Sequence, residues 1–435
     1  MEYRLKYGDS VIQLNIPQQH VLNFIEVHDR ETEVDNREVL RKALNQPLNA
    51  PSLPRAVANK HVVVLVEDAT RDIDVETLAD VVSAQLTTVA SLTMIIATGT
   101  HDPETPGNHR IRDLWRRYLL SRGVPEFDVL IHDCRAEPFD DYGETTTYRN
   151  RLLVNPQIRK ADAFLVFSDM KNHYFAGYSN AIKDFLPGVC AFETTERNHA
   201  LALEDASTFG HHPWHPDPAR RKNPVAQDMV EAYHRIVGNR PAYLIATIEK
   251  NHRMLWAAYG ELKTVTIAGM QEVDRLMSRT VQASDLLIVS PGGYPNDESL
   301  YIAQRALELS KNALKPGGHI LFLAECRNGI GPRSARKNFY DLLAQPIPRV
   351  LKLLEKKYVL YSHKAYKFAR LMQQTSTIAM VTALEQKVVE KIHLQYTNRP
   401  QEFIDQLLTE KPDLTINIVN DGNKIALHRS GGNAV

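Results

Sequence analysis

The chain has 435 residues, of which 43% are hydrophobic and 24% charged, enough for two or three domains at about 150 residues each. Its 52 basic and 52 acidic residues cancel, so no global charge favours nucleic acid or an anionic membrane as a partner. The sequence has no apolar run of about 18 residues, no signal-peptide layout and three widely spaced cysteines, which together predict a cytoplasmic protein with reduced thiols.

The first part of the chain predicts a hairpin, a helix and a buried strand in that order. EYRLKYG and SVIQLNIP alternate in polarity on either side of Gly8 and Asp9, which predicts a β-hairpin. Residues 32–44 are helical in pattern, and the prolines after them end the helix. Residues 61–66, HVVVLV, form a continuous apolar run. Such a run is typical of a strand buried on both faces of a parallel sheet.

The same pattern recurs along the chain. Apolar runs occupy residues 92–97, 127–131 and 163–167, and helical stretches at residues 75–85 and 110–122 separate the runs. Alternating strands and helices predict an α/β domain with a mostly parallel sheet. Ligands of such sheets bind beyond the carboxyl ends of the strands.

A second set of strands and helices starts near residue 270. A strand at residues 285–290 is followed by a helix from about Leu300, and a turn at residues 315–318 leads into a strand at 319–324. We therefore predict two α/β domains, residues 1–270 and 271–435.

Polar residues follow the predicted strands. His101, His132 and His173 come after three separate strands, so the fold would bring them to one edge of the sheet. A single loop histidine is usually only solvated, and the spacing alone leaves a shared function undecided. The cluster His211–His215 contains a proline and is followed by others, so we interpret it as a structural loop rather than a metal site.

Several ordered motifs resemble one known family. KNHYFAGYS at residues 171–179 is followed by Lys183, LPG at 186–188 and NH at 198–199. DATR at 68–71, GTH at 99–101 and GGYP at 292–295 fit the same pattern. Over roughly residues 60–335 the chain resembles the nickel-pincer nucleotide-dependent lactate racemases.

The resemblance implies two α/β domains with the active site in the cleft between them, and a racemase or epimerase that inverts C2 of a 2-hydroxy acid by reversible hydride transfer. The implied cofactor is a nickel-pincer nucleotide, a pyridinium-3-thioamide-5-thiocarboxylic acid mononucleotide with nickel, bound covalently to a lysine. The implied roles are acid/base for His101 and His173, covalent tether for Lys183, nickel ligand for His199, cofactor loop for Asp68 and Thr70, and substrate binding for Arg71, Tyr301 and Arg305. The expected partners are the substrate and, transiently, the proteins that synthesise the cofactor. The sequence leaves the oligomeric state open, with a homodimer as one possibility.

The residue types suit this chemistry independently. Removing the C2 hydrogen as a proton would place negative charge beside the carboxylate, whereas removing it as a hydride requires a cofactor because no side chain accepts hydrides. A histidine can take the hydroxyl proton near neutral pH, and two enantiomers call for two such bases.

The chain departs from the family at three points. The family's SGGRK is SNAIK here, ending at Lys183, and Asp102 replaces an arginine beside His101. Ile302 and Arg305 replace a glutamine and a lysine, which predicts a 2-hydroxy acid other than lactate. Three alternatives stay open: an oxidoreductase that releases a 2-oxo acid, a non-catalytic cofactor carrier or sensor, and a zinc hydrolase.

Overall fold

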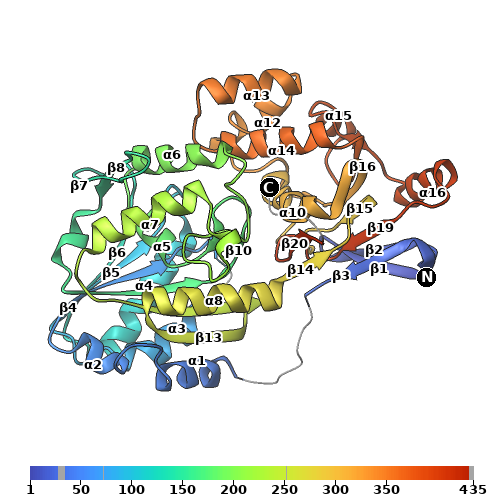
Figure 1. The fold of residues 1–435 in the computed structure, drawn as a ribbon. Coiled ribbons are helices and arrows are strands. Elements are labelled where there is room, and N and C mark those ends of the chain that lie inside the picture. Colours follow the sequence, from blue (N-terminus) through green and yellow to red (C-terminus); the bar gives the residue numbers. More distant parts are fainter. Residues whose placement is uncertain (28–34, 72, 251, 431–435) are drawn as a thin grey trace. The chain divides into compact units, whose positions relative to one another are not determined.

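A computed structural model describes residues 1–27, 35–71, 73–250 and 252–430, and it has the predicted mixed α/β architecture (Figure 1). The chain forms two compact units, unit 1 from Met1–Asp29 with Asp274–Val435 and unit 2 from Arg30–Val273. The division near residue 270 lies close to the predicted one, whereas the N-terminal segment belongs to unit 1. The reason is that strand β3 (Val21–Ile25) pairs with β19 (Ile416–Val419), at the other end of the chain.

Unit 2 contains a six-stranded sheet in the order β13-β12-β9-β4-β5-β6, parallel except for the β12–β13 pair. Its helices and strands are α1 (Asn36–Asn45), α2 (Leu53–Val57), β4 (His61–Glu67), α3 (Val75–Ser83), β5 (Ser91–Ala97), α4 (Pro106–Ser121), β6 (Glu126–Ile131), β7 (Asp140–Glu144), β8 (Arg151–Val154), β9 (Ala163–Asp169), β10 (Lys171–His173), β11 (Gly177–Ser179), α5 (Ile182–Phe185), α6 (Phe192–Ala200), α7 (Pro224–Val237), β12 (Ala242–Lys250) and β13 (Arg253–Glu261); α8 (Leu262–Met277) spans the boundary between the units. The predicted strands at residues 61–66, 92–97, 127–131 and 163–167 are thus confirmed.

The central strand β4 shows why its sequence is a solid apolar run. Val62, Val64 and Val66 join a core with residues of α1, α3 and α4, while Val63 and Leu65 are equally buried on the other face. A strand covered on both faces has no solvent side, so polar residues do not alternate with the apolar ones.

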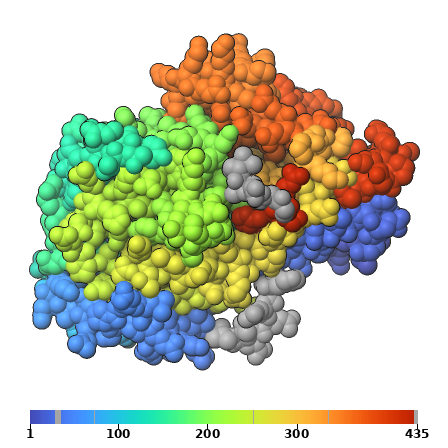
Figure 2. Space-filling view, viewed as in Figure 1, coloured from blue at the N-terminus to red at the C-terminus, as the bar shows by residue number. Residues whose placement is uncertain are grey.

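Unit 1 contains a second six-stranded sheet, in the order β18-β17-β16-β15-β19-β3, and all of its strand pairs are parallel. Its other elements are β1 (Glu2–Tyr7), β2 (Ser10–Asn15), β14 (Ser278–Val281), β15 (Ser284–Val289), α9 (Leu300–Ala303), α10 (Arg305–Ser310), β16 (Leu314–Leu323), α11 (Arg333–Arg336), α12 (Tyr340–Leu343), α13 (Ile347–Lys356), α14 (Ser362–Gln374), β17 (Thr377–Val381), α15 (Gln386–Glu390), β18 (Gln395–Tyr396), α16 (Pro400–Glu410) and β20 (Ala426–Arg429). Helices α12, α13 and α14 pack on one another and form the orange surface in Figure 2.

Two local predictions for unit 1 have different outcomes. The hairpin is confirmed, because β1 and β2 pair antiparallel around Gly8, whose φ is +53°. The turn predicted at residues 315–318 lies instead inside β16, where the register with β15 shifts. Gly317 has a φ of +71°, and a Cβ on Gly318 would lie 2.8 Å from the Asp285 carbonyl oxygen. The two glycines therefore form a bulge within the strand.

Two expectations from composition can be compared with the described part of the chain. Cys134, Cys190 and Cys326 are free and buried. None of the described helices has the length and apolar character needed to cross a bilayer.

Candidate active site

The site lies at the switch point of the unit 2 sheet. The chain runs outward from β4 through β5 to β6, whereas β9 lies on the other side of β4. The loops after β4 and β9 therefore diverge at the carboxyl edge of the sheet, where doubly wound proteins bind their ligands. Asp68 and Arg71 follow β4, His101 follows β5, and His173 ends β10, just beyond β9. The topology thus brings together residues that are up to about a hundred positions apart.

His101 is held by the loop that follows β4. Its Nδ1 lies 2.8 Å from Asp68 Oδ2, and Thr70 donates its hydroxyl to Asp68 Oδ1 at 2.7 Å. Burial alone would raise the pKa of Asp68, but His101, Arg71 and Thr70 outweigh burial and lower it. Asp68 is therefore an ionised acceptor that directs the proton of a neutral His101 to Nδ1 and leaves Nε2 as the base.

Helix α4 connects the loops that carry Asp68 and His101. Asn108 is fully buried; its Oδ1 accepts the backbone N–H of Ala69 at 2.9 Å, and its Nδ2 donates to the Asp102 carbonyl at 3.2 Å. A Cβ on Gly107 would lie 2.3 Å from the Ala69 Cβ. The absence of a side chain at Gly107 thus lets α4 approach the loop closely enough for Asn108 to reach both segments.

Arg71 lies among carboxylates that the sequence analysis did not single out. Its Nε is 3.7 Å from Glu67 Oε1, four residues earlier. Burial raises the pKa of Glu67 to about 7, against the lowering effect of Arg71. Burial, and then the neighbouring Glu67, raise the pKa of Asp184 as well. For Arg71, burial lowers the pKa, but the surrounding carboxyl groups outweigh it, so the guanidinium is charged.

Lys183 and His173 form a hydrogen-bonded pair. The backbone N–H of Ala176 donates to His173 Nδ1 at 3.2 Å, so the neutral ring carries its proton on Nε2. That nitrogen is 3.2 Å from Lys183 Nζ. An ammonium has no lone pair, so the lysine accepts this hydrogen bond only as a neutral amine. Burial, and then the positive charge of Arg71, lower the pKa of Lys183 to about 7, in agreement with that geometry.

His199 completes the group from α6. Burial lowers its pKa most, and the charges of Lys183 and His101 lower it further, while a backbone hydrogen bond with Thr195 raises it. The resulting pKa is about 3, so the imidazole is neutral. A neutral imidazole with one nitrogen engaged by the backbone is the usual form of a histidine metal ligand. The centre of the Phe175 ring lies 5.2 Å from the ring centre of His199, 4.5 Å from the ring centre of His173 and 5.7 Å from Lys183 Nζ.

The structure brings seven of the nine predicted site residues together in unit 2. They are Asp68, Thr70, Arg71, His101, His173, Lys183 and His199. Tyr301, in α9, and Arg305, at the start of α10, belong to unit 1.

Two histidine signals in the sequence turn out to be structural. His132 is fully buried and bonds the Cys190 carbonyl at 3.0 Å, so it supports the fold rather than the site. In the proline-containing loop, His212 is buried and accepts the Trp214 backbone N–H at 3.1 Å, as expected of a structural loop. Across residues 1–27, 35–71, 73–250 and 252–430, no three His, Cys, Asp or Glu side chains converge to hold a metal ion.

Sequence reasoning missed Glu67, Asn108, Phe175 and Asp184. Glu67 had a detectable signal, because it ends the central strand and precedes Arg71 by four residues. Asn108 had none, since its role depends on the approach of α4 to a loop far away in sequence.

The fold is a doubly wound α/β sheet, and its switch point carries two histidines, a lysine with a lowered pKa and a charged arginine, residue types that acid–base enzymes use. The comparisons with known families identify the class of protein. The lactate racemase N-terminal domain matches residues 7–210, and the lactate racemase C-terminal domain matches residues 279–427. The chain therefore belongs to the lactate racemase family and is a racemase, an isomerase. Members of this family use a nickel cofactor.

Individual relatives agree with this assignment. The lactate racemase of Thermoanaerobacterium thermosaccharolyticum is 24% identical over 334 residues, 75% of each chain. That of Lactiplantibacillus plantarum is 22% identical over 403 residues, 89% of this chain and 90% of its own.

Two solved structures share the fold. The lactate racemase apoprotein from T. thermosaccharolyticum has a TM-score of 0.83 at 20% identity, covering 98% of this chain and 100% of that one. A Thermotoga maritima protein has a TM-score of 0.58 at 13% identity, covering 91% and 97%.

Proposed function

We propose that the protein inverts C2 of a 2-hydroxy acid other than lactate by reversible hydride transfer to a nickel-pincer nucleotide attached to Lys183. The observation that carries this proposal is the pairing of a neutral lysine with His173, beside Arg71 and a second histidine base. An uncharged amine is the nucleophilic form that covalent attachment requires.

The residues in the site fit the cofactor. Lys183 would hold it covalently, His199 would supply a neutral imidazole to nickel, and Asp68 and Thr70 would line its loop. When bound, the cofactor would supply the hydride acceptor that no side chain can provide.

The altered SNAIK segment is accommodated in the fold. Asn180 Oδ1 accepts, at 2.9 Å, the backbone N–H of Ile182, the first residue of the short helix that carries Lys183. Ala181 has a φ of −53°, a conformation that requires no glycine. These contacts favour a tether segment that keeps Lys183 in place without the family's glycines.

The chain's own residues would bind the substrate and transfer its hydroxyl proton. Arg71 would hold the substrate carboxylate, since a guanidinium binds it through two parallel hydrogen bonds. His101 Nε2 would take or return the hydroxyl proton of one enantiomer, with Asp68 orienting the ring. His173 would do so for the other enantiomer once Lys183 is attached to the cofactor and the ring changes tautomer, so that Nδ1 carries the proton in place of its bond from Ala176 and Nε2 is the base. Tyr301 and Arg305 would bind the rest of the substrate.

The test is intact mass and bound metal on protein produced together with the cofactor-biosynthesis proteins. We expect a covalent adduct of nucleotide size with nickel, absent from Lys183→Ala and present in the exposed control Lys160→Ala. Loaded protein should then interconvert the enantiomers of a 2-hydroxy acid.

Each alternative has its own result. A released 2-oxo acid without racemisation would favour the oxidoreductase, and an adduct without any turnover would favour the carrier or sensor. Zinc without an adduct would favour the hydrolase.

A further inference from the structure

Glu67 lies where the central strand of the unit 2 sheet ends. It is the last residue of β4, and it is only 4% exposed. The last backbone pair between β4 and β9 joins Val66 to Phe167. Just beyond that pair, Glu67 Oε2 accepts the backbone N–H of Asp169 at 2.9 Å. The Glu67 side chain thus continues the connection between the two strands at the edge where their loops diverge.

The other carboxylate oxygen of Glu67 faces Arg71. Glu67 Oε1 lies 3.7 Å from Arg71 Nε, and the Arg71 side chain is 23% exposed. Among the described residues, none accepts a hydrogen bond from Arg71 Nη1 or Nη2. A guanidinium has donors on more than one edge, so with Glu67 beside Nε it still has the Nη1 and Nη2 pair to bind a carboxylate.

Asp169 links this arrangement to the strand that carries His173. Its backbone N–H donates to Glu67, and its Oδ2 lies 2.5 Å from Lys171 Nζ. Lys171 begins β10, which ends at His173. Glu67 therefore contacts both segments of the switch point, the loop that carries Arg71 and the strand end that leads to His173.

We propose that Glu67 is a positioning residue, which holds Arg71 so that its Nη1 and Nη2 groups face the substrate carboxylate. This inference rests on the proposed function, in which Arg71 binds that carboxylate. Glu67 itself acts only through Arg71. An arginine side chain loses rotamer freedom when it binds a ligand, and a fixed carboxylate beside it reduces this loss because part of the ordering precedes binding.

Glutamine is a close match in shape to Glu67 but cannot replace it in this role. Both oxygens of a carboxylate accept hydrogen bonds, whereas an amide has one accepting oxygen and a donating NH2 group. In Glu67→Gln, the oxygen that keeps the Asp169 N–H leaves the NH2 group facing the Arg71 guanidinium, donor against donor. The variant therefore releases Arg71 from its position.

A purely electrostatic role for Glu67 predicts the opposite result. Removing a negative charge beside Arg71 leaves the guanidinium with more net positive charge around it, which would strengthen the binding of an anion. Loss of positioning weakens that binding instead. The direction of the change in affinity therefore distinguishes the two roles.

The experiment is a titration of the full-length, cofactor-free protein with lactate, whose carboxylate serves as the probe. The readout is the carbon-detected Cζ–Nε signal of Arg71 in protein labelled with ¹³C,¹⁵N-arginine, and Arg71→Gln assigns it. The measurement is made at about pH 9, where Glu67 is ionised because its pKa is about 7. We expect Glu67→Gln to shift the Arg71 signal before lactate is added, and to weaken lactate binding by about 5- to 30-fold.

The control is a second glutamate–arginine pair of the same separation. Glu76 Oε1 lies 3.7 Å from Arg117 Nη2, but both side chains are about two-thirds exposed. Glu76→Gln should leave the Arg71 signal and the lactate affinity unchanged. If Glu67→Gln loses the signals of the other arginines and so does not fold, Glu67→Asp takes its place. That variant keeps the charge but is one methylene shorter, and it should weaken lactate binding in the same direction.

The outcomes separate this inference from the proposed function. If lactate moves the wild-type Arg71 signal but binds Glu67→Gln equally or more tightly, the positioning role is overturned and the proposed role of Arg71 stands. If lactate does not move the wild-type signal, Arg71 binds no carboxylate, so its role in the proposed function fails and the positioning role fails with it.

Discussion

At the scale of single residues, His101 and His132 follow neighbouring strands and look alike in the sequence. The structure separates them, because His101 is exposed and bonded to Asp68 whereas His132 is fully buried against the Cys190 carbonyl. Whether a loop histidine faces solvent depends on what packs over the loop, which the local sequence does not encode. The resemblance implied an acid/base role for His101 and none for His132, which spacing alone could not do.

The charge state of Lys183 gives the first prediction at this scale. Its pKa of about 7 follows from burial and from Arg71, both of which disfavour the ammonium, so the amine is neutral above about pH 7 and charged below it. In cofactor-free protein labelled with ¹³C-lysine, the Cε resonance of Lys183 should titrate near pH 7, whereas exposed Lys160 should titrate near its ordinary value of about 10.4. Lys183→Ala assigns the resonance.

A second variant tests the cause. Arg71→Gln removes the neighbouring positive charge and leaves Glu67 and Asp184 in place, so it should raise the pKa of Lys183. A Lys183 resonance that titrates above about pH 9 in the wild type would contradict the neutral-amine assignment and the tautomer inferred for His173.

At the scale of elements, the buried strands could be predicted from sequence because their environment is uniform. Every residue from Val62 to Val66 is in a core, so the local sequence carries the signal without help from distant residues. The bulge at residues 315–318 carried a different signal. Pro316, Gly317 and Gly318 are typical of a turn, and only the continued pairing of β16 with β15 shows that the strand passes through them.

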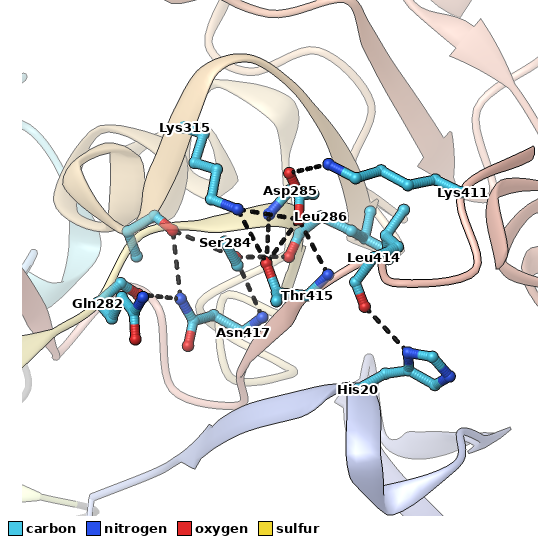
Figure 3. A network of polar contacts seen from close by, with 11 residues as sticks. His20, Gln282, Ser284, Asp285, Leu286, Lys315, Lys411, Leu414, Thr415 and Asn417 are labelled. Atoms are coloured by element: carbon cyan, nitrogen blue, oxygen red, sulfur yellow. Dashed lines mark hydrogen bonds and ion pairs between the residues drawn. The ribbon is translucent and has the colours of Figure 1, made fainter.

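One carboxylate connects three strands of unit 1 (Figure 3). Asp285 accepts hydrogen bonds from Lys411 at 2.7 Å, Lys315 at 3.0 Å and the Thr415 hydroxyl at 2.6 Å. Asp285 lies in β15, Lys315 in β16, Thr415 directly before β19, and Lys411 directly after α16. Burial alone would raise the pKa of Asp285, but Lys411, Thr415 and Lys315 lower it far below its usual value.

This network predicts a pH-dependent loss in Asp285→Asn. At pH 7 the variant should unfold in urea with a free energy lower by about 1–3 kcal/mol, since it loses charge-assisted hydrogen bonds. The folded pKa is the depressed one, so the carboxylate stabilises above the unfolded pKa of about 3.9, and the difference should shrink as pH falls below it. Exposed Asp413→Asn is the control. A difference that stays constant down to about pH 3 would contradict the role of the charge.

At the scale of the whole molecule, the sequence could not predict that unit 1 is discontinuous. Strand β3 lies at the edge of its sheet and is only partly buried, and Asn23 interrupts its apolar residues, so it lacks the solid apolar run that marks the central strands. Its partner β19 is almost four hundred residues away, and parallel pairing over that distance leaves no local signal. The sequence does indicate a division near residue 270, because a new series of strands begins there.

The discontinuity has a consequence for stability. Leu5 of β1 is fully buried in a core with residues of β15, β16 and β19, whereas Leu65 of β4 is fully buried in unit 2. Each change to alanine should cost about 2–5 kcal/mol. We expect Leu5→Ala to lower amide hydrogen-exchange protection in β15 and β19 while β5 and β9 keep theirs, and Leu65→Ala to do the reverse. If either variant lowers protection equally in both sheets, the two units unfold as one, and the N-terminal residues stabilise the whole chain rather than unit 1 alone.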